Sequence, residues 1–328
     1  QTMPLISVII PTYNREKFVG KAIDSVLRQG FAGFEVIIID DGSTDGTRKI
    51  LEAYGTKISC MFQENSGVSS ARNAGIRVAQ GMWVAFLDSD DEWTKDYLAC
   101  QLAQIKAYPE AVAHIANAVT VLPSGERSSL FVETGLADRF KEKSCLAFER
   151  PLSVIVQYAP WFLQSSIIRR DVLLQAGLFD VGLSIAEDLD VIARVALRGP
   201  VAICRNELVE IYRREESIVN LGAQSLKRGI YRWNAFGKVY SNLLSSSGLT
   251  RIEKATVERA LSSTKRALGN VLVMADRKSE ARQAYKQSFS LHPSVRSLVK
   301  VVGTYLPSVV SRALVRKDRH LLSEEDTR

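Results

Sequence analysis

Four acids occur within five positions directly after an apolar run. Residues 82–87 read MWVAFL, and Asp88, Asp90, Asp91 and Glu92 follow. Like charges at the end of a buried strand repel one another, so the acids need either a positive partner or a turn that stays in solvent. Asp88 and Asp90 stand at i and i+2, which puts both carboxylates on one side of an extended chain. Two such ligands, completed by water and diphosphate oxygens, suit Mg²⁺ or Mn²⁺, whereas Asp91 and Glu92 are expected to cap the turn into the next helix.

A second acidic segment, DDGSTDG at 40–46, follows the apolar run 34–39. A carboxylate here can accept a hydrogen bond from an N–H group on the edge of a nucleobase. The segment also matches the acidic positions and the glycine of a calcium-binding EF-hand loop, but such a loop follows a helix, and this one follows a β-rich run. A strand-to-helix turn capped by Asp and Ser side chains is the simpler interpretation, and it is compatible with the base contact.

Two further segments carry charged residues that suit catalysis. Glu187 and Asp188 open a predicted helix at 187–199. Acids at this end of a helix complement its dipole, but a carboxylate can also act as a general base toward a hydroxyl nucleophile. Arg72, in the segment 66–75, lies near the start of another predicted helix and can contact either a phosphate or an active-site acid.

The order of elements predicts an α/β fold with a parallel sheet. Short apolar strands alternate with amphipathic helices, and this alternation is typical of parallel sheets covered by helices. Strands are predicted at 5–10, 34–39, 58–62, 82–87, 111–122 and 161–170, with one or two more within 201–214. Ligands bind outside the carboxyl ends of such strands, so the polar segments that follow the first, second and fourth strands should meet at one edge of the sheet. After about residue 220 the pattern is helical.

Charge is unevenly distributed along the 328 residues. The net charge is +7, and residues 251–328 hold 16 Lys or Arg against 8 Asp or Glu, which leaves the rest of the chain near neutrality. A basic helical tail suits an anionic lipid surface, a solvated helical face or a dimerisation element. The four cysteines have no paired spacing, which favours a reducing compartment. We find no signal peptide and no apolar run of about 18 residues, so we expect a cytoplasmic protein without a spanning helix.

Five motifs, in this order and spacing, strongly resemble the inverting family-2 glycosyltransferases with the GT-A fold. The motifs are VIIPTYNRE, VIIIDDGSTDGT, ENSGVSSARNAG, FLDSDDEW and EDLDVIAR, and the resemblance covers roughly residues 4–215. It implies an α/β GT-A catalytic domain at 1–219, Rossmann-like with a mostly parallel sheet, and an α-helical extension at 220–328. The implied activity is transfer of a hexosyl or N-acetylhexosaminyl group from a nucleotide sugar, with UDP favoured.

The resemblance also implies roles for individual residues. Asp188 would be the catalytic base, steadied by Glu187, and Asp90 together with Asp88 would hold Mn²⁺ or Mg²⁺. The donor and its nucleotide would be bound by Pro11, Thr12, Tyr13, Asp40, Asp41, Arg72, Asp88 and Ser89. The acceptor side would include Trp161, Gln164 and Glu187.

The implied reaction is a single displacement with inversion. A hydroxyl group of a glycan or lipid-linked glycan, deprotonated by Asp188, would attack the anomeric carbon on the face opposite the diphosphate. The implied setting is bacterial polysaccharide or lipopolysaccharide synthesis in the cytoplasm. There the basic tail would attach the protein peripherally to the inner face of the membrane, or join two copies as a homodimer, and no nucleic-acid partner is expected.

Two other functions remain open from the residues. A sugar-phosphate nucleotidyltransferase also needs a base pocket and Mg²⁺, but its first loop is usually rich in glycine and basic residues that grip a triphosphate. Here that loop reads PTYNREKF, with no glycine before Gly20. A sugar-binding module without chemistry is the non-enzymatic alternative, and the presence of both Asp90 and Asp188 argues against it.

Overall fold

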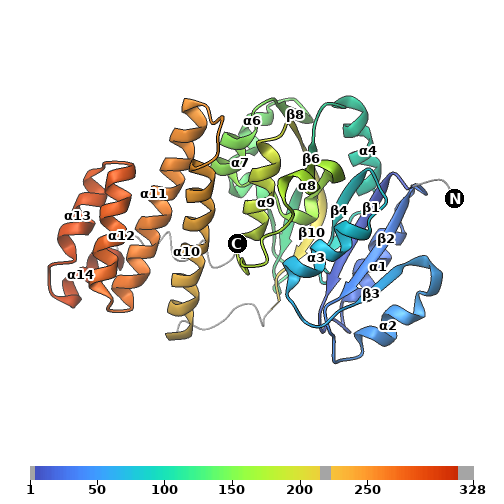
Figure 1. Ribbon diagram of the computed structural model, residues 1–328, viewed down its shortest axis with the longest axis horizontal. Coiled ribbons are helices and arrows are strands. Elements are labelled where there is room, and N and C mark those ends of the chain that lie inside the picture. Colours follow the sequence, from blue (N-terminus) through green and yellow to red (C-terminus); the bar gives the residue numbers. More distant parts are fainter. Residues whose placement is uncertain (1–3, 215–222, 317–328) are drawn as a thin grey trace. The chain divides into compact units, whose positions relative to one another are not determined.

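The chain forms two compact units, residues 1–214 and residues 215–328, in a computed structural model. The structure describes residues 4–214 and 223–316, so the predicted domain boundary at 219/220 lies outside the described residues. The first unit is a sheet flanked by helices, and the described part of the second unit is helical (Figure 1).

The described part of the first unit contains one mixed sheet of ten strands. Their bounds are β1 (Ile6–Thr12), β2 (Phe34–Asp40), β3 (Ser59–Phe62), β4 (Trp83–Phe86), β5 (Glu92–Trp93), β6 (Ala113–Val121), β7 (Arg127–Ser129), β8 (Cys145–Phe148), β9 (Ser166–Arg169) and β10 (Val201–Tyr212). The order is β3-β2-β1-β4-β9-β6-β10-β5, with β7 paired to β6 and β8 paired to β10. Strands β3, β2, β1 and β4 run parallel, as predicted, whereas β9 is antiparallel to both of its neighbours.

Helices pack on both faces of the parallel strands, which explains the continuous apolar runs of the sequence. The helices of this unit are α1 (Val19–Leu27), α2 (Thr47–Ala53), α3 (Val68–Val78), α4 (Tyr97–Ala107), α5 (Leu130–Glu133), α6 (Ala137–Phe140), α7 (Leu152–Tyr158), α8 (Arg170–Ala176) and α9 (Glu187–Ala196). Val8 and Ile10 of β1 share a buried core with Val19 of α1. Ile9, which points to the other face, lies so close to Gly75 of α3 that a Cβ added there would be 2.6 Å from Ile9 Cγ2. This glycine therefore allows α3 to approach β1 closely.

Two predicted strands differ from the structure. The segment predicted at 161–170 begins with a 3₁₀ turn at Leu163–Ser165, and only Ser166–Arg169 forms a strand. The hydroxyl groups of Ser165 and Ser166 donate to the carbonyl oxygens of residues 162 and 163, a local bonding pattern that competes with strand pairing. The segment 201–214 contains one long strand, β10, with register shifts on either side of Glu207 rather than a break.

The second unit is a stack of helices in its described part. They are α10 (Ala223–Leu244), α11 (Arg251–Met274), α12 (Lys278–Leu291), α13 (Val295–Gly303) and α14 (Ser308–Arg316). Helix α11 starts with a reciprocal capping box between Thr250 and Glu253, and the Tyr285 hydroxyl of α12 donates to Asn270 Oδ1 of α11 at 2.8 Å. None of the helices that the structure describes is long and apolar enough to cross a membrane.

Candidate active site

Three loops leave the sheet at the carboxyl ends of β1, β2 and β4. Thr12, the last residue of β1, is paired with Asp40, the last residue of β2. Ile9 of β1 is paired with Phe86, the last residue of β4. The polar segments that follow these strands therefore start from one edge of the sheet, where open α/β sheets bind their ligands.

A buried arginine joins the acids of two sequence motifs. Arg72, on α3, is 2% exposed. Its Nη2 donates to Asp88 Oδ1 at 2.9 Å, and its Nη1 donates to Glu187 Oε1 and to Asp188 Oδ1, both at 3.1 Å. The ring of Phe179 lies 5.4 Å from the guanidinium carbon. Of the two contacts that the sequence allowed for Arg72, phosphate or active-site acid, the structure shows the contact with acids.

Local structure explains how the acids reach this guanidinium. Glu187 and Asp188 are the first two residues of α9, where the helix dipole favours negative charge. Ala186, directly before them, adopts a left-handed conformation with φ 66°. This conformation costs a residue with a side chain about 1–2 kcal/mol, and it turns the chain into α9 so that both acids face Arg72.

Gln164 binds the other oxygen of Asp88. Its Nε2 donates to Asp88 Oδ2 at 2.6 Å and to Asp91 Oδ2 at 3.0 Å, and Asp91 Oδ1 accepts from the Tyr212 N–H group at 2.9 Å. The prediction that Asp91 caps the turn into the next helix is therefore wrong, because its two oxygens accept bonds from Gln164 and Tyr212 instead. Gln164 and Trp161, predicted on the acceptor side, are buried as well, at 6% and 8% exposure.

Asp90 lies in a turn that is closed by the bond from the Asp91 N–H group to the Asp88 carbonyl oxygen at 3.1 Å. Contrary to the prediction, Asp88 and Asp90 therefore do not lie on an extended strand. Its Oδ2 is 3.4 Å from Arg15 Nε, and Arg214 Nη2 donates to its carbonyl at 2.9 Å. Burial and the charge of Asp88 raise the pKa of Asp90, while both arginines lower it. Arg15 was not among the predicted site residues, although a basic residue just beyond the end of β1 was a usable signal.

The acid cluster fits a divalent cation only together with a bound diphosphate. Among the described residues, no group of three or more His, Cys, Asp or Glu side chains is arranged to hold a metal ion. Both oxygens of Asp88 accept hydrogen bonds, from Arg72 at 2.9 Å and from Gln164 at 2.6 Å. The ion pair between the Asp90 carboxylate and Arg15 is longer, at 3.4 Å. Mg²⁺ commonly takes one or two carboxylates and completes its shell with water and phosphate oxygens. Asp90 therefore fits the role of protein ligand better than Asp88.

Asp40 and Asp41 organise the loops of the predicted nucleotide pocket. Asp41 Oδ1 accepts from the Ser66 N–H group at 2.9 Å, and its Oδ2 accepts from the Gly67 N–H group at 2.8 Å, which fastens the loop before α3. Asp40 Oδ1 accepts from the Ser43 N–H group at 2.9 Å. Asp41 Oδ1 also accepts from Gln63 Nε2 at 2.6 Å, so the second lone pair of Oδ2 is the acceptor that Asp41 keeps for a nucleobase.

Thr12 supplies an unused polar group beside these loops. Its Oγ1 is buried and has no hydrogen-bond partner among the described residues. A buried hydroxyl group without a partner is unfavourable until a ligand or a water molecule satisfies it. The neighbouring Tyr13 is 44% exposed, while Pro11 and Ser89 are buried. These observations favour a ligand pocket at the end of β1.

The surroundings of Asp188 suit a general base. Burial raises its pKa, the Arg72 guanidinium lowers it, and the charges of Glu187 and Asp88 raise it, with a result of about 7. The side chain remains 31% exposed, so an acceptor hydroxyl can reach it. A carboxylate with a pKa near neutrality is deprotonated in roughly half or more of the molecules at physiological pH, and it is still basic enough to accept a proton.

We expect the pH dependence of the reaction to report this pKa. Only the deprotonated form of Asp188 accepts a proton, so kcat/KM should fall about tenfold per pH unit below about 7. The Glu187→Gln substitution removes a like charge beside Asp188 and should move this acidic limb to lower pH. Initial rates between about pH 5 and about pH 9 test both expectations. An acidic limb that does not move in Glu187→Gln would contradict its assignment to Asp188.

A sheet covered by helices, with an acid cluster beyond the carboxyl ends of its parallel strands, is the architecture of the GT-A class. Residues 7–152 match the sequence family described as Glycosyl transferase family 2. These residues make up a little under half of the chain, and the resemblance to this family and the fold class that the sequence predicted are confirmed.

Two curated relatives each match a little under a third of the chain. TuaG of Bacillus subtilis, a glycosyltransferase assigned to teichuronic acid biosynthesis, is 50% identical over 103 residues, which are 30% of this chain and 41% of TuaG. WfgD of Escherichia coli, a UDP-Glc:α-D-GlcNAc-diphosphoundecaprenol β-1,3-glucosyltransferase, is 40% identical over 103 residues, which are 31% of this chain and 41% of WfgD. The chain thus spans about two fifths of the length of these relatives, 41% in both cases.

A solved structure extends the likeness to nearly the whole chain. TarS residues 1–349 from S. aureus, in complex with UDP-GlcNAc, match with a TM-score of 0.63 over 96% of this chain and 91% of that chain. The sequence identity is 19%, so this likeness shows the fold.

Proposed function

We propose that this chain transfers a sugar from a nucleotide sugar, with UDP as the favoured nucleotide, to a hydroxyl group of a lipid-linked glycan, with inversion. The Arg72 cluster carries the proposal. It brings Asp88 and the Glu187–Asp188 pair to one guanidinium, although α3 and α9 are more than 100 positions apart in the chain. A single displacement needs a base on the acceptor side of the anomeric carbon and groups that hold the donor on the opposite side, and holding both in place lowers the barrier.

Asp188 acts as the general base in this mechanism. Its carboxylate accepts the proton of the acceptor hydroxyl group while the hydroxyl oxygen forms a bond to the anomeric carbon. The bond from that carbon to the diphosphate oxygen breaks, and its electron pair leaves with the nucleoside diphosphate, so the configuration inverts. Arg72 holds the Asp188 carboxylate in position during proton transfer.

The donor is proposed to bind over the loops that follow β1 and β2. Thr12 offers a hydroxyl group without a partner among the described residues, Tyr13 offers an exposed ring, and Asp41 can accept from a base N–H group. A uridine donor is supported by the UDP-GlcNAc bound to TarS and by the UDP-Glc in the name of WfgD.

A divalent cation, Mn²⁺ or Mg²⁺, is proposed to be held by Asp90 and the donor diphosphate. When bound, it would neutralise the charge that develops on the departing diphosphate. Asp88, held by Arg72 and Gln164, would face the sugar. Burial and the charge of Asp88 raise the pKa values of Asp90 and Asp91, and a cation here would offset the repulsion from Asp88.

The Asp90→Ala substitution is expected to lower metal-dependent transfer by about 100-fold or more, because a metal at the leaving group contributes several kcal/mol. Glu92→Ala is the matched control. Glu92 lies in β5, and its ion pair with the largely exposed Arg28 has a separation of 4.0 Å, so its loss should change the rate less than about twofold. Rates measured against Mn²⁺ concentration compare the two variants, and equal losses would remove Asp90 as the metal ligand.

The acceptor and its location are proposed from the same comparisons. The acceptor in the name of WfgD is a sugar on diphosphoundecaprenol. An acceptor of this class would place the reaction at the cytoplasmic face of the cell membrane, in cell-surface glycan synthesis.

A panel of nucleotide sugars, read by thermal shift with Mn²⁺ and followed by transfer to an undecaprenyl diphosphate sugar, tests the proposed function. Transfer from a UDP-sugar is the expected result. Pyrophosphate release from a nucleoside triphosphate would indicate a nucleotidyltransferase instead. Donor binding without any transfer would indicate a sugar-binding module.

A further inference from the structure

Helix α13 presents its apolar side chains outward. Val295, Leu298, Val299 and Val302 follow the i, i+3, i+4, i+7 spacing of a single helical face. All four are exposed, Val295 to 79% and Val302 to 56%. In a helix at the end of a helical stack, the apolar face normally packs inward and a polar face meets water. Helix α13 has the opposite orientation.

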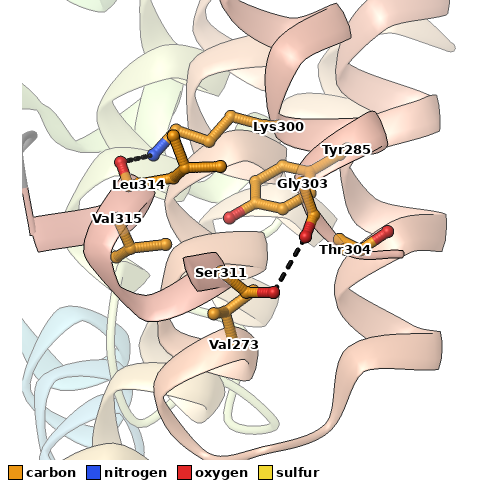
Figure 2. A pocket seen from close by; sticks show the side chains of 8 residues that line it. All are labelled: Val273, Tyr285, Lys300, Gly303, Thr304, Ser311, Leu314 and Val315. Atoms are coloured by element: carbon orange, nitrogen blue, oxygen red, sulfur yellow. Dashed lines mark hydrogen bonds between the residues drawn. The ribbon is translucent and has the colours of Figure 1, made fainter. Parts of the chain in front are cut away.

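Polar and small residues occupy the inner face of the same helix. Ser297, Lys300 and Gly303 are buried, and Figure 2 shows Lys300 and Gly303 at a small pocket that α11, α12, α13 and α14 line together. Lys300 Nζ donates to the Leu314 carbonyl at 2.9 Å, and Ser311 Oγ donates to the Gly303 carbonyl at 2.8 Å. These bonds join the polar side of α13 to α14, so the apolar side stays outside.

The turn after α13 and the first turn of α14 extend this surface. Tyr305, Leu306, Val309 and Val310 are all exposed, Val309 to 81%, and α13 contacts α14. We name these residues together the α13–α14 apolar face: Val295, Leu298, Val299, Val302, Tyr305, Leu306, Val309 and Val310. Large exposed apolar surfaces of this kind mark contacts with proteins or membranes.

Basic side chains border this apolar face. Residues 276–316 contain eight Lys or Arg and two acids, and seven of the eight basic residues remain when Lys300, buried on the inner face of α13, is set aside. The Arg282 guanidinium lies 3.7 Å from the centre of the Tyr305 ring, and Lys278 Nζ donates to the Leu306 carbonyl at 2.8 Å. An apolar face with a cationic border complements an anionic bilayer surface, where apolar side chains enter the headgroup region and cations meet lipid phosphates.

We propose that the α13–α14 apolar face binds the surface of a bilayer that contains anionic lipids. The two helices have nine residues each, far fewer than a bilayer span requires, so the binding is interfacial. The proposal rests on the second unit alone and is independent of the chemistry of the first unit. Its consequence for the proposed transfer is that the protein gathers at the surface where a lipid-linked acceptor is found.

Flotation of the full chain with lipid vesicles tests this proposal. Vesicles of phosphatidylcholine with about 30% phosphatidylglycerol should carry the protein upward, and pure phosphatidylcholine should carry at least about fivefold less. The triple variant Val295→Ser, Val299→Ser, Val302→Ser should bind about tenfold more weakly, without a lower melting temperature, because these side chains are exposed. Ile252→Ser, which removes an apolar side chain that is 73% exposed on α11, is the matched control and should bind like the wild type.

Two results would overturn the proposal. One is equal flotation of the wild type and the triple variant on anionic vesicles. The other is a wild-type dimer in sedimentation velocity that becomes a monomer in the triple variant, with no vesicle binding by either, since a second copy would then cover the face. Unchanged transfer to a soluble acceptor analogue by the triple variant, together with lost flotation, would support a membrane role separate from catalysis.

Discussion

Replacement of Asp188 by Asn is expected to reduce kcat for sugar transfer by about 10³-fold while the donor still binds. Asn has nearly the same shape and can still accept a hydrogen bond from Arg72 Nη1, but it cannot take the proton of the acceptor hydroxyl group. General-base catalysis contributes about 10²–10⁴-fold, so removal of the base alone accounts for a loss of this size. The contact between Arg72 and Asp88 on the donor side is left intact.

Steady-state rates at saturating donor measure this loss, and calorimetric titration with the nucleoside diphosphate measures binding. Asp190→Asn is the matched control, since Asp190 lies in the first turn of the same helix but pairs with Arg194. Its kcat should stay within about threefold of the wild type, with a small loss of stability. Full activity of Asp188→Asn would exclude Asp188 as the base, and lost nucleotide binding in both variants would indicate damage to α9 instead.

The sheet edge that bears the site could be predicted from local sequence. Strands β1 and β2 are runs of Ile and Val that are buried on both faces, a pattern that arises where helices cover both sides of a parallel sheet. Polar residues begin where these runs stop, so the sequence indicates the points at which the chain leaves the sheet. The positions of Asp41, Asp88 and Asp90 after strand ends, and of Asp188 at a helix start, followed from the same reasoning.

Side-chain partners that are distant in the sequence could not be predicted in this way. Gln164 and Asp91 are 73 positions apart, and no local pattern distinguishes an acid that binds such a partner from one that caps a turn. The partner of Arg72 depends on how closely α3 packs on β1. That distance is set by the contact between Gly75 and Ile9, which only the folded chain shows.

The Arg72→Met substitution is expected to destabilise the protein by about 3–5 kcal/mol, because it leaves three carboxylates without the buried cation that they share. Arg72→Lys keeps the charge, but a single ammonium group lacks the planar fork that reaches three acids, so it should recover only part of the loss. Urea unfolding followed by tryptophan fluorescence measures the change. Arg77→Met, at an exposed position on the same helix, is the control and should change the free energy of unfolding by less than about 0.5 kcal/mol.

The pH dependence of this loss of stability distinguishes the electrostatic contribution of Arg72 from its packing contribution. Arg72 lowers the pKa of Asp188, so in the variant the folded chain should hold the Asp188 proton more tightly than the wild type does. When the folded state binds more protons, the free energy of unfolding falls as pH rises. The deficit of Arg72→Met should therefore be largest above about pH 7 and shrink toward about pH 5, where Asp188 is protonated in both proteins. A deficit that does not change with pH would mean that Arg72 stabilises the fold mainly by packing against Phe179, and that the acids do not depend on it for charge balance.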